Sequence, residues 1–335
     1  MVSENGLYKM MDRAPIVVFV YNRADHAKRL LDSLSMCDGS VESEVFIFSD
    51  GPKESEDESI NESNRKRVNE VRSLIHDSMW NEKFKSITVT EAEKNKGLAN
   101  SIISGVTDII NRYGKVIVLE DDLVLAEGFL DYMNQALNAY QDDEEIFAIS
   151  GWTYPCKGLK SYDKDGWLYY RACSWGWGTW KDRWANVIFD PIGANFEGKL
   201  ANKEWCDKFC RGGNDLPNML RMQLEGKRDS WAIRWNAAAS DLDMMTLYPR
   251  ESFVINEGRD GSGVHCGEAS YEQGDFACSK VSYDFNDIKP NEKLIKQAWH
   301  FESDTLSKKI KRNLKTIFVE HKVPNVVKKL VGIEE

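Results

Sequence analysis

Three consecutive acidic residues, Glu120, Asp121 and Asp122, are the strongest chemical signal in this sequence. They directly follow the apolar run VIVL, where carboxylates repel one another and are costly to hold unless a cation or water relieves them. A hard divalent cation prefers carboxylate oxygens and can keep open positions for a phosphate. We therefore expect a metal site at this triplet. The alternative is a solvated acidic turn.

Two other polar side chains follow apolar runs. Asp50 comes after EVFIFS and before a Gly-Pro pair. Its carboxylate could accept hydrogen bonds from a nucleotide base or a ribose hydroxyl, or it could cap its own turn. Arg23 follows PIVVFVYN and could pair with a phosphate through two hydrogen bonds. The alternative for Arg23 is an ordinary surface arginine.

A glycine-rich stretch, INEGRDGSGVHCG, covers residues 255–267 and includes Gly263 and His265. Glycines allow backbone N–H groups to approach a phosphate closely, and the histidine could bind a metal ion or donate to phosphate. A flexible surface loop with no ligand explains the same pattern equally well.

Tryptophans are concentrated between residues 152 and 184, where the segment SWGWGTWKDRW occurs. Aromatic faces can stack on the C–H faces of sugars, but large aromatics more often fill a core. We expect most of these tryptophans to be core residues. Trp175 and Trp177, which flank Gly176, are expected to line a sugar site together with Trp231 of the later segment RDSWAIRW.

The apolar pattern predicts the elements that would position these residues. Short β-branched runs predict strands at 15–21, 44–49, 86–89, 115–120 and 145–150. Helical spacing of apolar residues lies between them, at 24–34, 68–75, 98–110 and 128–140. This alternation predicts an α/β fold with a Rossmann-like, doubly wound, mostly parallel sheet. Ligands of such sheets bind beyond the carboxyl ends of the strands, which is where Arg23, Asp50 and the acidic triplet fall.

The chain divides by composition into three expected parts. Residues 1–125 form a nucleotide-binding half, 126–305 an irregular acceptor-binding and catalytic half of the same domain, and 306–335 a basic helical tail. The tail has eight basic and three acidic residues, a net +5 that leaves −15 for residues 1–305. That acidity argues against nucleic-acid binding, and the tail could contact an anionic membrane surface or could pack on the domain.

Four segments, in their order along the chain, resemble the GT-A glycosyltransferases. They are PIVVFVYNR, FIFSDG, VIVLEDDLVLAEGFLDYM and the GVHCG loop. The closest likeness is to N-acetylglucosaminyltransferase I and to similar bacterial enzymes of polysaccharide or lipopolysaccharide synthesis. The resemblance covers residues 14–151 well and 216–267 loosely. It implies a GT-A fold and an inverting transfer from a UDP-sugar to a hydroxyl of a glycan or glycolipid acceptor.

The resemblance also implies a role for each matching residue. Asp122 would hold Mn²⁺ (or Mg²⁺), Asp121 would sit beside the ribose and donor sugar, and Asp50 would recognise uracil. Arg23 would contact the diphosphate, with Glu120 and Lys96 counted among the donor-binding residues. The loop through Gly263 and His265 would close over the diphosphate, and His265 is also a possible metal ligand.

Asp229, in the context Asp-Ser-Trp, would match the catalytic base of the family, which lies in an Asp-Asp-Trp context. Trp231 and Trp235 could desolvate its carboxylate. The alternative for Asp229 is a cap of the following helix. Four other carboxylates are the next candidates for the base: Asp165, Asp182, Asp215 and Glu225.

Two other functions stay open from the sequence. A nucleotidyltransferase would need a basic, glycine-rich segment after the first strand, which Asn22-Arg23-Ala24 does not supply. A non-catalytic carbohydrate-binding protein would not need the acidic triplet.

No apolar run reaches the roughly 20 residues of a membrane span, and the irregular spacing of the cysteines fits reduced thiols. We therefore expect a cytoplasmic enzyme, with peripheral contact at the inner membrane face as a possibility.

Overall fold

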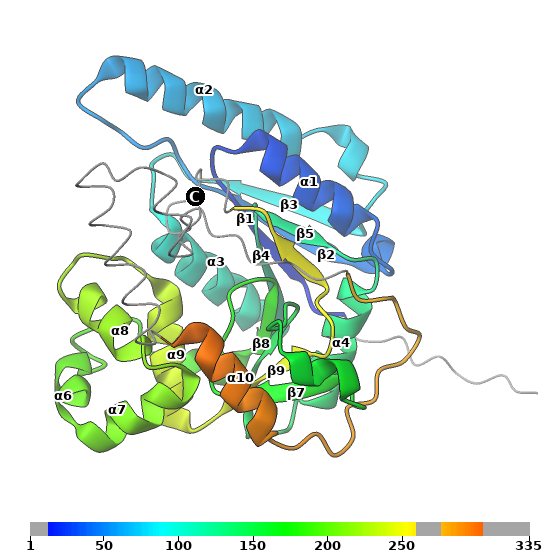
Figure 1. Ribbon diagram of the computed structural model, residues 1–335. Coiled ribbons are helices and arrows are strands. Elements are labelled where there is room, and N and C mark those ends of the chain that lie inside the picture. The colour runs from blue at the N-terminus through cyan, green and yellow to red at the C-terminus, as the bar shows by residue number, and fades with distance from the viewer. Residues whose placement is uncertain (1–12, 259–275, 304–335) are drawn as a thin grey trace, which may run out of the picture.

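Eight strands form one central sheet, in the order β3-β2-β1-β4-β8-β6-β9-β7. This computed structural model describes residues 13–258 and 276–303 (Figure 1). The strands are β1 (Ile16–Val20), β2 (Glu44–Ser49), β3 (Ser86–Glu91), β4 (Lys115–Glu120), β6 (Ile146–Ser150), β7 (Gly166–Tyr169), β8 (Trp177–Trp180) and β9 (Met245–Pro249). A two-stranded sheet joins β5 (Leu123–Leu125) to β10 (Val254–Asn256).

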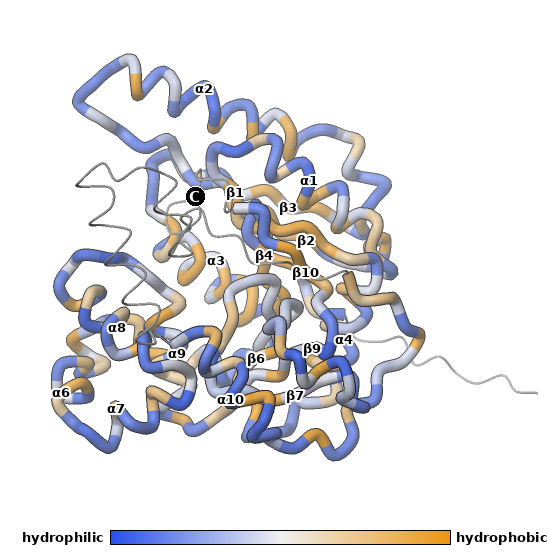
Figure 2. The backbone as a smooth tube through the Cα atoms, viewed as in Figure 1, coloured by the Kyte–Doolittle hydropathy of each residue, from blue (hydrophilic) through white to orange (hydrophobic). Residues whose placement is uncertain are grey.

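The strand β1 lies inside the sheet because its β-branched and aromatic side chains fill both faces. Ile16, Val18 and Val20 belong to one apolar cluster, and Val17 and Phe19 belong to another on the opposite face. All five are buried, as expected for a strand with parallel neighbours on both sides. Figure 2 shows this apolar centre, with more hydrophilic helices outside it.

Helices cover both faces of the sheet. On one face lie α1 (Ala24–Ser35), α2 (Glu58–Ile75) and α4 (Phe129–Ala139), and on the other lie α3 (Leu98–Tyr113) and α9 (Trp231–Leu242). The remaining helices are α5 (Lys181–Ala185), α6 (Phe196–Ala201), α7 (Lys203–Phe209), α8 (Leu216–Leu224) and α10 (Glu292–Glu302). In Figure 1, α6, α7 and α8 gather beside α9, away from α1 and α2. The expected α/β class with a mostly parallel sheet is confirmed.

The stretch 152–184, expected to be irregular, contains two strands of the central sheet. Strand β8 lies between β4 and β6 and runs antiparallel to both, and β7 runs antiparallel to β9. The expectation of an irregular stretch is therefore wrong here. The four residues of β8, Trp-Gly-Thr-Trp, are too few for strand periodicity to reveal, and burial between β4 and β6 decides their conformation.

Four indole rings form the core beneath β8, on the α3 and α9 face. Trp177 is fully buried, with ring centroids 5.0 Å from Trp231, 5.3 Å from Trp235 and 5.8 Å from Trp184. Trp231 is only 3 % exposed. The expectation that Trp177 and Trp231 line a sugar site does not fit these positions, because neither face of a core indole is open to a ligand.

No helix among the described residues is long and apolar enough to cross a membrane. The expected tail, 306–335, lies outside the described residues. The expected boundary at residue 125 stays a prediction. Strands from both sides of that boundary share one sheet, since β4 pairs with β8 and β5 pairs with β10.

The tryptophan core generates a stability prediction. Trp177→Ala should lower the free energy of unfolding by about 3–5 kcal/mol, because it leaves a cavity between three other rings. Ile192→Ala is the control, since Ile192 is 88 % exposed and its loss should cost less than about 0.5 kcal/mol. Urea denaturation followed by circular dichroism measures both. Equal losses in the two variants would contradict a structural role for Trp177.

Candidate active site

The carboxyl ends of β1 and β4 place Arg23 beside the acidic triplet. The two strands are parallel neighbours, and Phe19 of β1 lies opposite Glu120 of β4. The chain therefore leaves both strands at one edge of the sheet, and the residues that follow each strand meet there. This confirms the convergence that the strand pattern predicts for these positions.

The guanidinium of Arg23 bridges Asp121 and Asp122. Its Nη2 atom hydrogen-bonds to Asp121 Oδ1 and, at 3.1 Å, to Asp122 Oδ2, and its Nε atom lies 3.4 Å from Asp121 Oδ2. The three side chains are 18 %, 9 % and 14 % exposed. They form a largely desolvated ion group in which three acids, counting Glu120, face one guanidinium.

The pKa values in this ion group reflect its excess of negative charge. Burial, followed by repulsion from Asp122 and Asp121, raises the pKa of Glu120 well above its usual range, although Arg23 opposes the shift. Burial also raises the pKa of Asp121 against the pull of Arg23. Burial lowers the pKa of the Arg23 guanidinium, but Asp121 and Asp122 outweigh it and the net pKa is raised. An added cation would relieve the carboxylates.

Asp50 organises the loop that starts α3. Its carboxylate, 8 % exposed, accepts hydrogen bonds from the N–H groups of Gly51 (2.8 Å), Lys96 (2.8 Å) and Gly97 (3.0 Å), and from the side-chain amide of Asn95 (3.1 Å). The turn-capping interpretation of Asp50 therefore holds, and it extends to a second loop. The contact with uracil stays a prediction. Lys96 takes part in this network through its backbone N–H, and the residue is exposed.

The start of the glycine-rich loop lies against Asp122. β10 pairs antiparallel with β5, and Asn256 lies opposite Leu123. Asn256 Oδ1 accepts from the N–H of Gly258 at 2.9 Å, and its Nδ2 lies 3.5 Å from Asp122 Oδ1. A Cβ atom on Gly258 would lie 2.2 Å from Asp122 Oδ2, so only glycine leaves this carboxylate its place.

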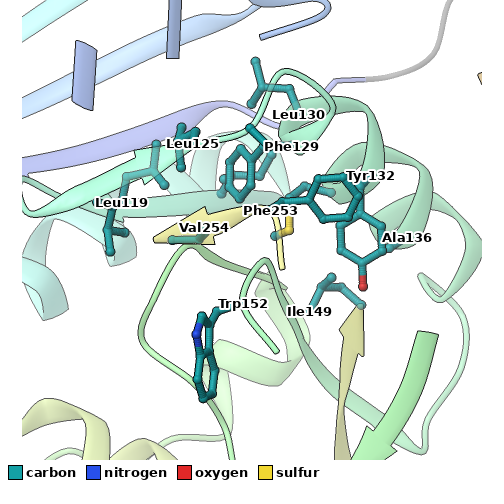
Figure 3. Close-up of a cluster of buried hydrophobic side chains, with 14 of the residues drawn as sticks. Leu119, Leu125, Phe129, Leu130, Tyr132, Ala136, Ile149, Trp152, Phe253 and Val254 are labelled. Carbon is teal, nitrogen blue, oxygen red and sulfur yellow. The ribbon is translucent and has the colours of Figure 1, made fainter. Parts of the chain in front are cut away.

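A hydrophobic cluster fixes β10 at this position (Figure 3). Phe253 stacks on Tyr132 of α4, with ring centroids 4.8 Å apart. Val254 and Phe129 are buried in the same cluster. The side chains of α4 therefore hold the strand that brings Asn256 and Gly258 to Asp122. Gly263 and His265 lie outside the described residues, so their expected roles at the diphosphate stay predictions.

The chemistry of these donors fits a hard divalent cation. No group of three or more His, Cys, Asp or Glu side chains in the described part of the chain is arranged to hold a metal by itself. Cations such as Mg²⁺, however, are commonly held by one or two carboxylates together with substrate phosphates. Asp122, which is 14 % exposed and lies beside two further acids, offers such a carboxylate.

Asp229 lies toward the same edge of the sheet. β6 and β9 run in the direction of β4, because β4 and β6 are both antiparallel to β8 and β9 is parallel to β6. α9 ends at Leu242, close to the amino end of β9 at Met245, and Trp235 packs on Phe147 of β6 at 4.0 Å. The other end of α9, which follows Asp229, therefore points to the carboxyl edge.

The carboxylate of Asp229 is 62 % exposed and accepts from Arg234 Nη2 at 2.9 Å through Oδ1. Ser230, not Asp229, caps α9, because its side chain accepts from the N–H of Ile233. The expected desolvation of Asp229 by Trp231 and Trp235 is wrong, since both indoles point into the core. Within the described residues, Asp229 Oδ2 accepts no hydrogen bond.

Trp175 is the one expected sugar-lining tryptophan that stays partly exposed. It precedes β8, at the end where Trp177 pairs with Val118 of β4, and therefore lies near Glu120. Trp152 supports it edge-on, with ring centroids 4.8 Å apart. Trp175 therefore offers a partly exposed aromatic ring at this end of β8.

Sequence reasoning missed Asn256 and Arg234 as partners of Asp122 and Asp229. Asn256, two residues before the first glycine of the glycine-rich stretch, is a visible signal for a loop anchor. No pattern in the sequence shows the three-residue pairing of β5 with β10, because both strands are too short for periodicity.

The Asp50 network can be tested through stability. Asp50→Ala should cost at least about 2 kcal/mol, because four donors, one of them buried and three partly buried, lose their acceptor at once. Asp57→Ala is the matched control: Asp57 is an exposed cap that accepts from the N–H of Ser59, and its removal should cost clearly less. Guanidinium denaturation compares them. A loss for Asp50→Ala no larger than that of the control would contradict the role given to Asp50.

Comparison with known proteins supplies the family. Residues 2–188 match the GNT-I family, which is more than half of the chain. A curated relative from Arabidopsis thaliana, alpha-1,3-mannosyl-glycoprotein 2-beta-N-acetylglucosaminyltransferase, is 28 % identical over 153 residues. That match covers 41 % of this chain and 34 % of the relative, so the chain spans about a third of the relative's length.

Two solved structures show only a distant likeness. Staphylococcus aureus TarS is 17 % identical with a TM-score of 0.28, covering 41 % of this chain and 21 % of TarS. The mannosyltransferase PcManGT from Pyrobaculum calidifontis, solved with GDP-Man and Mn²⁺, is 12 % identical with a TM-score of 0.32, covering 68 % and 69 %. Scores this low do not establish a common fold. The match over residues 2–188 confirms the resemblance read from the sequence, and the chain belongs to the GNT-I family.

Proposed function

We propose that this protein is a glycosyltransferase with a GT-A-type fold that transfers a sugar from a UDP-sugar to a hydroxyl of a glycan or glycolipid, with inversion. The observation that carries the proposal is the ion group of Arg23, Asp121 and Asp122 at the carboxyl edge of the sheet, in a chain of the GNT-I family. The name of the plant relative specifies transfer of N-acetylglucosamine, which makes UDP-GlcNAc the first donor to test.

A divalent cation, Mn²⁺ or Mg²⁺, would be held by Asp122 and by the diphosphate of the donor. When bound, it would offset the negative charge that develops on the departing diphosphate. Arg23 would pair with a phosphate through its planar fork. Asp121 and Glu120 lie beside Asp122, where they would face the ribose and the donor sugar. Gly263 and His265 would follow Gly258 over the diphosphate.

Asp229 would act as the general base. In a single displacement, the acceptor O–H bond breaks as its oxygen bonds to the anomeric carbon, the bond from that carbon to phosphate breaks, and UDP leaves with the electron pair. The proton needs an acceptor on the side away from the metal. Asp229 Oδ2 lies outside the Arg234 hydrogen bond, on a side chain that is 62 % exposed. Asp215, by contrast, has both oxygens bonded to Arg171.

We propose a role in bacterial surface polysaccharide synthesis, in the cytoplasm. The basic residues of 306–329 would hold the enzyme near an anionic membrane that carries a lipid-linked acceptor. Trp175 would stack on a sugar ring of the donor or acceptor.

Removal of the metal ligand tests the proposal directly. Asp122→Asn should lower UDP release from UDP-GlcNAc with Mn²⁺ at least about 100-fold while the thermal unfolding curve stays near wild type, because a lost electrostatic stabiliser typically costs 10²–10³ in rate. Asp142→Asn, an exposed acid between α4 and β6, is the charge-matched control and should keep full activity. A screen of other UDP-sugars accompanies the assay. Full wild-type turnover in excess EDTA would rule the metal role out.

The base is tested separately. Asp229→Asn and Asp229→Ala should each lower kcat for transfer by about 10²–10⁴, the usual contribution of general base catalysis, and leave the affinities for UDP and Mn²⁺ near wild type. Glu225→Gln removes a neighbouring carboxylate in the same loop and should keep kcat. If both Asp229 variants keep more than about a tenth of kcat, Asp229 is not the base.

A further inference from the structure

The position of Arg23 poses a conflict with the proposed cation. Asp122 Oδ2 accepts from Arg23 Nη2 at 3.1 Å, and the same oxygen packs against Gly258, where a Cβ atom would come within 2.2 Å of it. A cation on Asp122 would therefore share this carboxylate with a guanidinium and lie next to its positive charge. Both charges compete for one carboxylate in a largely buried setting, where repulsion is poorly screened.

We propose that Arg23 serves as the internal counter-ion of Asp121 and Asp122 until a donor binds, and that its transfer from Asp122 to the diphosphate couples cation binding to donor binding. The inference rests on the proposed function, since it needs a cation at Asp122 and a nucleoside diphosphate as ligand. Toward the cation Arg23 is a positioning residue, because it acts through Asp122, and toward the diphosphate it is a binding residue.

In the proposed exchange, the Arg23 guanidinium changes its partner from the Asp122 carboxylate to the diphosphate. Without a donor, the guanidinium neutralises part of the charge of three clustered acids, so the site is less costly to keep folded. When a diphosphate arrives, its oxygens offer the guanidinium an equally good planar partner. Asp122 then becomes available to the cation, and the diphosphate completes the coordination of the cation. Cation and donor each strengthen binding of the other, and the coupling must be reciprocal.

A helix neighbour provides the matched control. Arg29 lies on α1, as the continuation of the segment that Arg23 begins, and pairs with Glu257 at 2.6 Å, one residue before Gly258. Its side chain is 45 % exposed, and it does not contact Asp121 or Asp122 among the described interactions. Arg29→Gln therefore removes a positive charge near the same loop without freeing Asp122.

The experiment measures Mn²⁺ affinity by electron paramagnetic resonance, with and without UDP, for the wild type, Arg23→Gln, Arg29→Gln and Asp122→Asn. Arg23→Gln should bind Mn²⁺ alone about tenfold more tightly than the wild type, the change expected for losing one charge-assisted hydrogen bond in competition. UDP should raise Mn²⁺ affinity strongly in the wild type and about tenfold less in Arg23→Gln. Arg29→Gln should behave as the wild type.

A gain of affinity cannot come from a damaged fold, which separates this role from a merely structural one. Thermal unfolding with rising Mn²⁺ gives a second measurement, because a ligand that binds more tightly stabilises more at equal concentration, even in a variant that starts less stable.

The outcomes separate the counter-ion role of Arg23 from the proposed function. If Mn²⁺ binds the wild type and is lost in Asp122→Asn, yet Arg23→Gln binds it no more tightly, the role of Arg23 is overturned and the proposed function stands. If Mn²⁺ binds neither the wild type nor Arg23→Gln, even with UDP, the metal-dependent function fails and the counter-ion role fails with it.

Discussion

The parallel pairing of β1 with β4 is the constraint on which the candidate site depends. It sets Phe19 opposite Glu120, so the chain leaves both strands at the same level and Arg23 meets the acidic triplet. Each strand alone would present an isolated polar group, with no reason to be buried. Together they form an ion group that is only 9–18 % exposed. The apolar residues of both strands supply the energy that keeps these charges near a poorly hydrated wall.

The second half of the chain completes that edge instead of forming a separate layer. β8 lies directly beside β4, and β10 lies beside β5, so residues more than 50 positions after the acidic triplet reach its surroundings. The hydrophobic contacts of Phe253 with Tyr132 hold β10, and the four buried indoles hold α9 against the sheet. Core packing in the second half is therefore what places Gly258 and Asp229 at the edge formed by the first half.

The sequence alone predicts the parallel strands and the residues at their ends, because long β-branched runs and the helices between them give a clear period. It does not predict β8, because four residues with two tryptophans and a glycine carry no period that separates strand from loop. It also assigns Trp177 and Trp231 to a sugar site, because residue type indicates an aromatic surface but not which way it faces. Ser230 and Asp229 compete for the same cap by composition, and only the helix geometry decides between them.

The position of β9 late in the sequence, together with the antiparallel insertion of β8, determines which part of the chain can fold independently. The stretch that matches the family ends at residue 188, but β9, which lies between β6 and β7, spans Met245–Pro249. A fragment limited to the matched stretch would leave β7 without a neighbour and expose the indoles of Trp177 and Trp184 to water, because Trp231 and Trp235 would be missing. The region of recognisable ancestry is therefore smaller than the cooperative unit, and changes in the less similar remainder will act on the stability of the shared part.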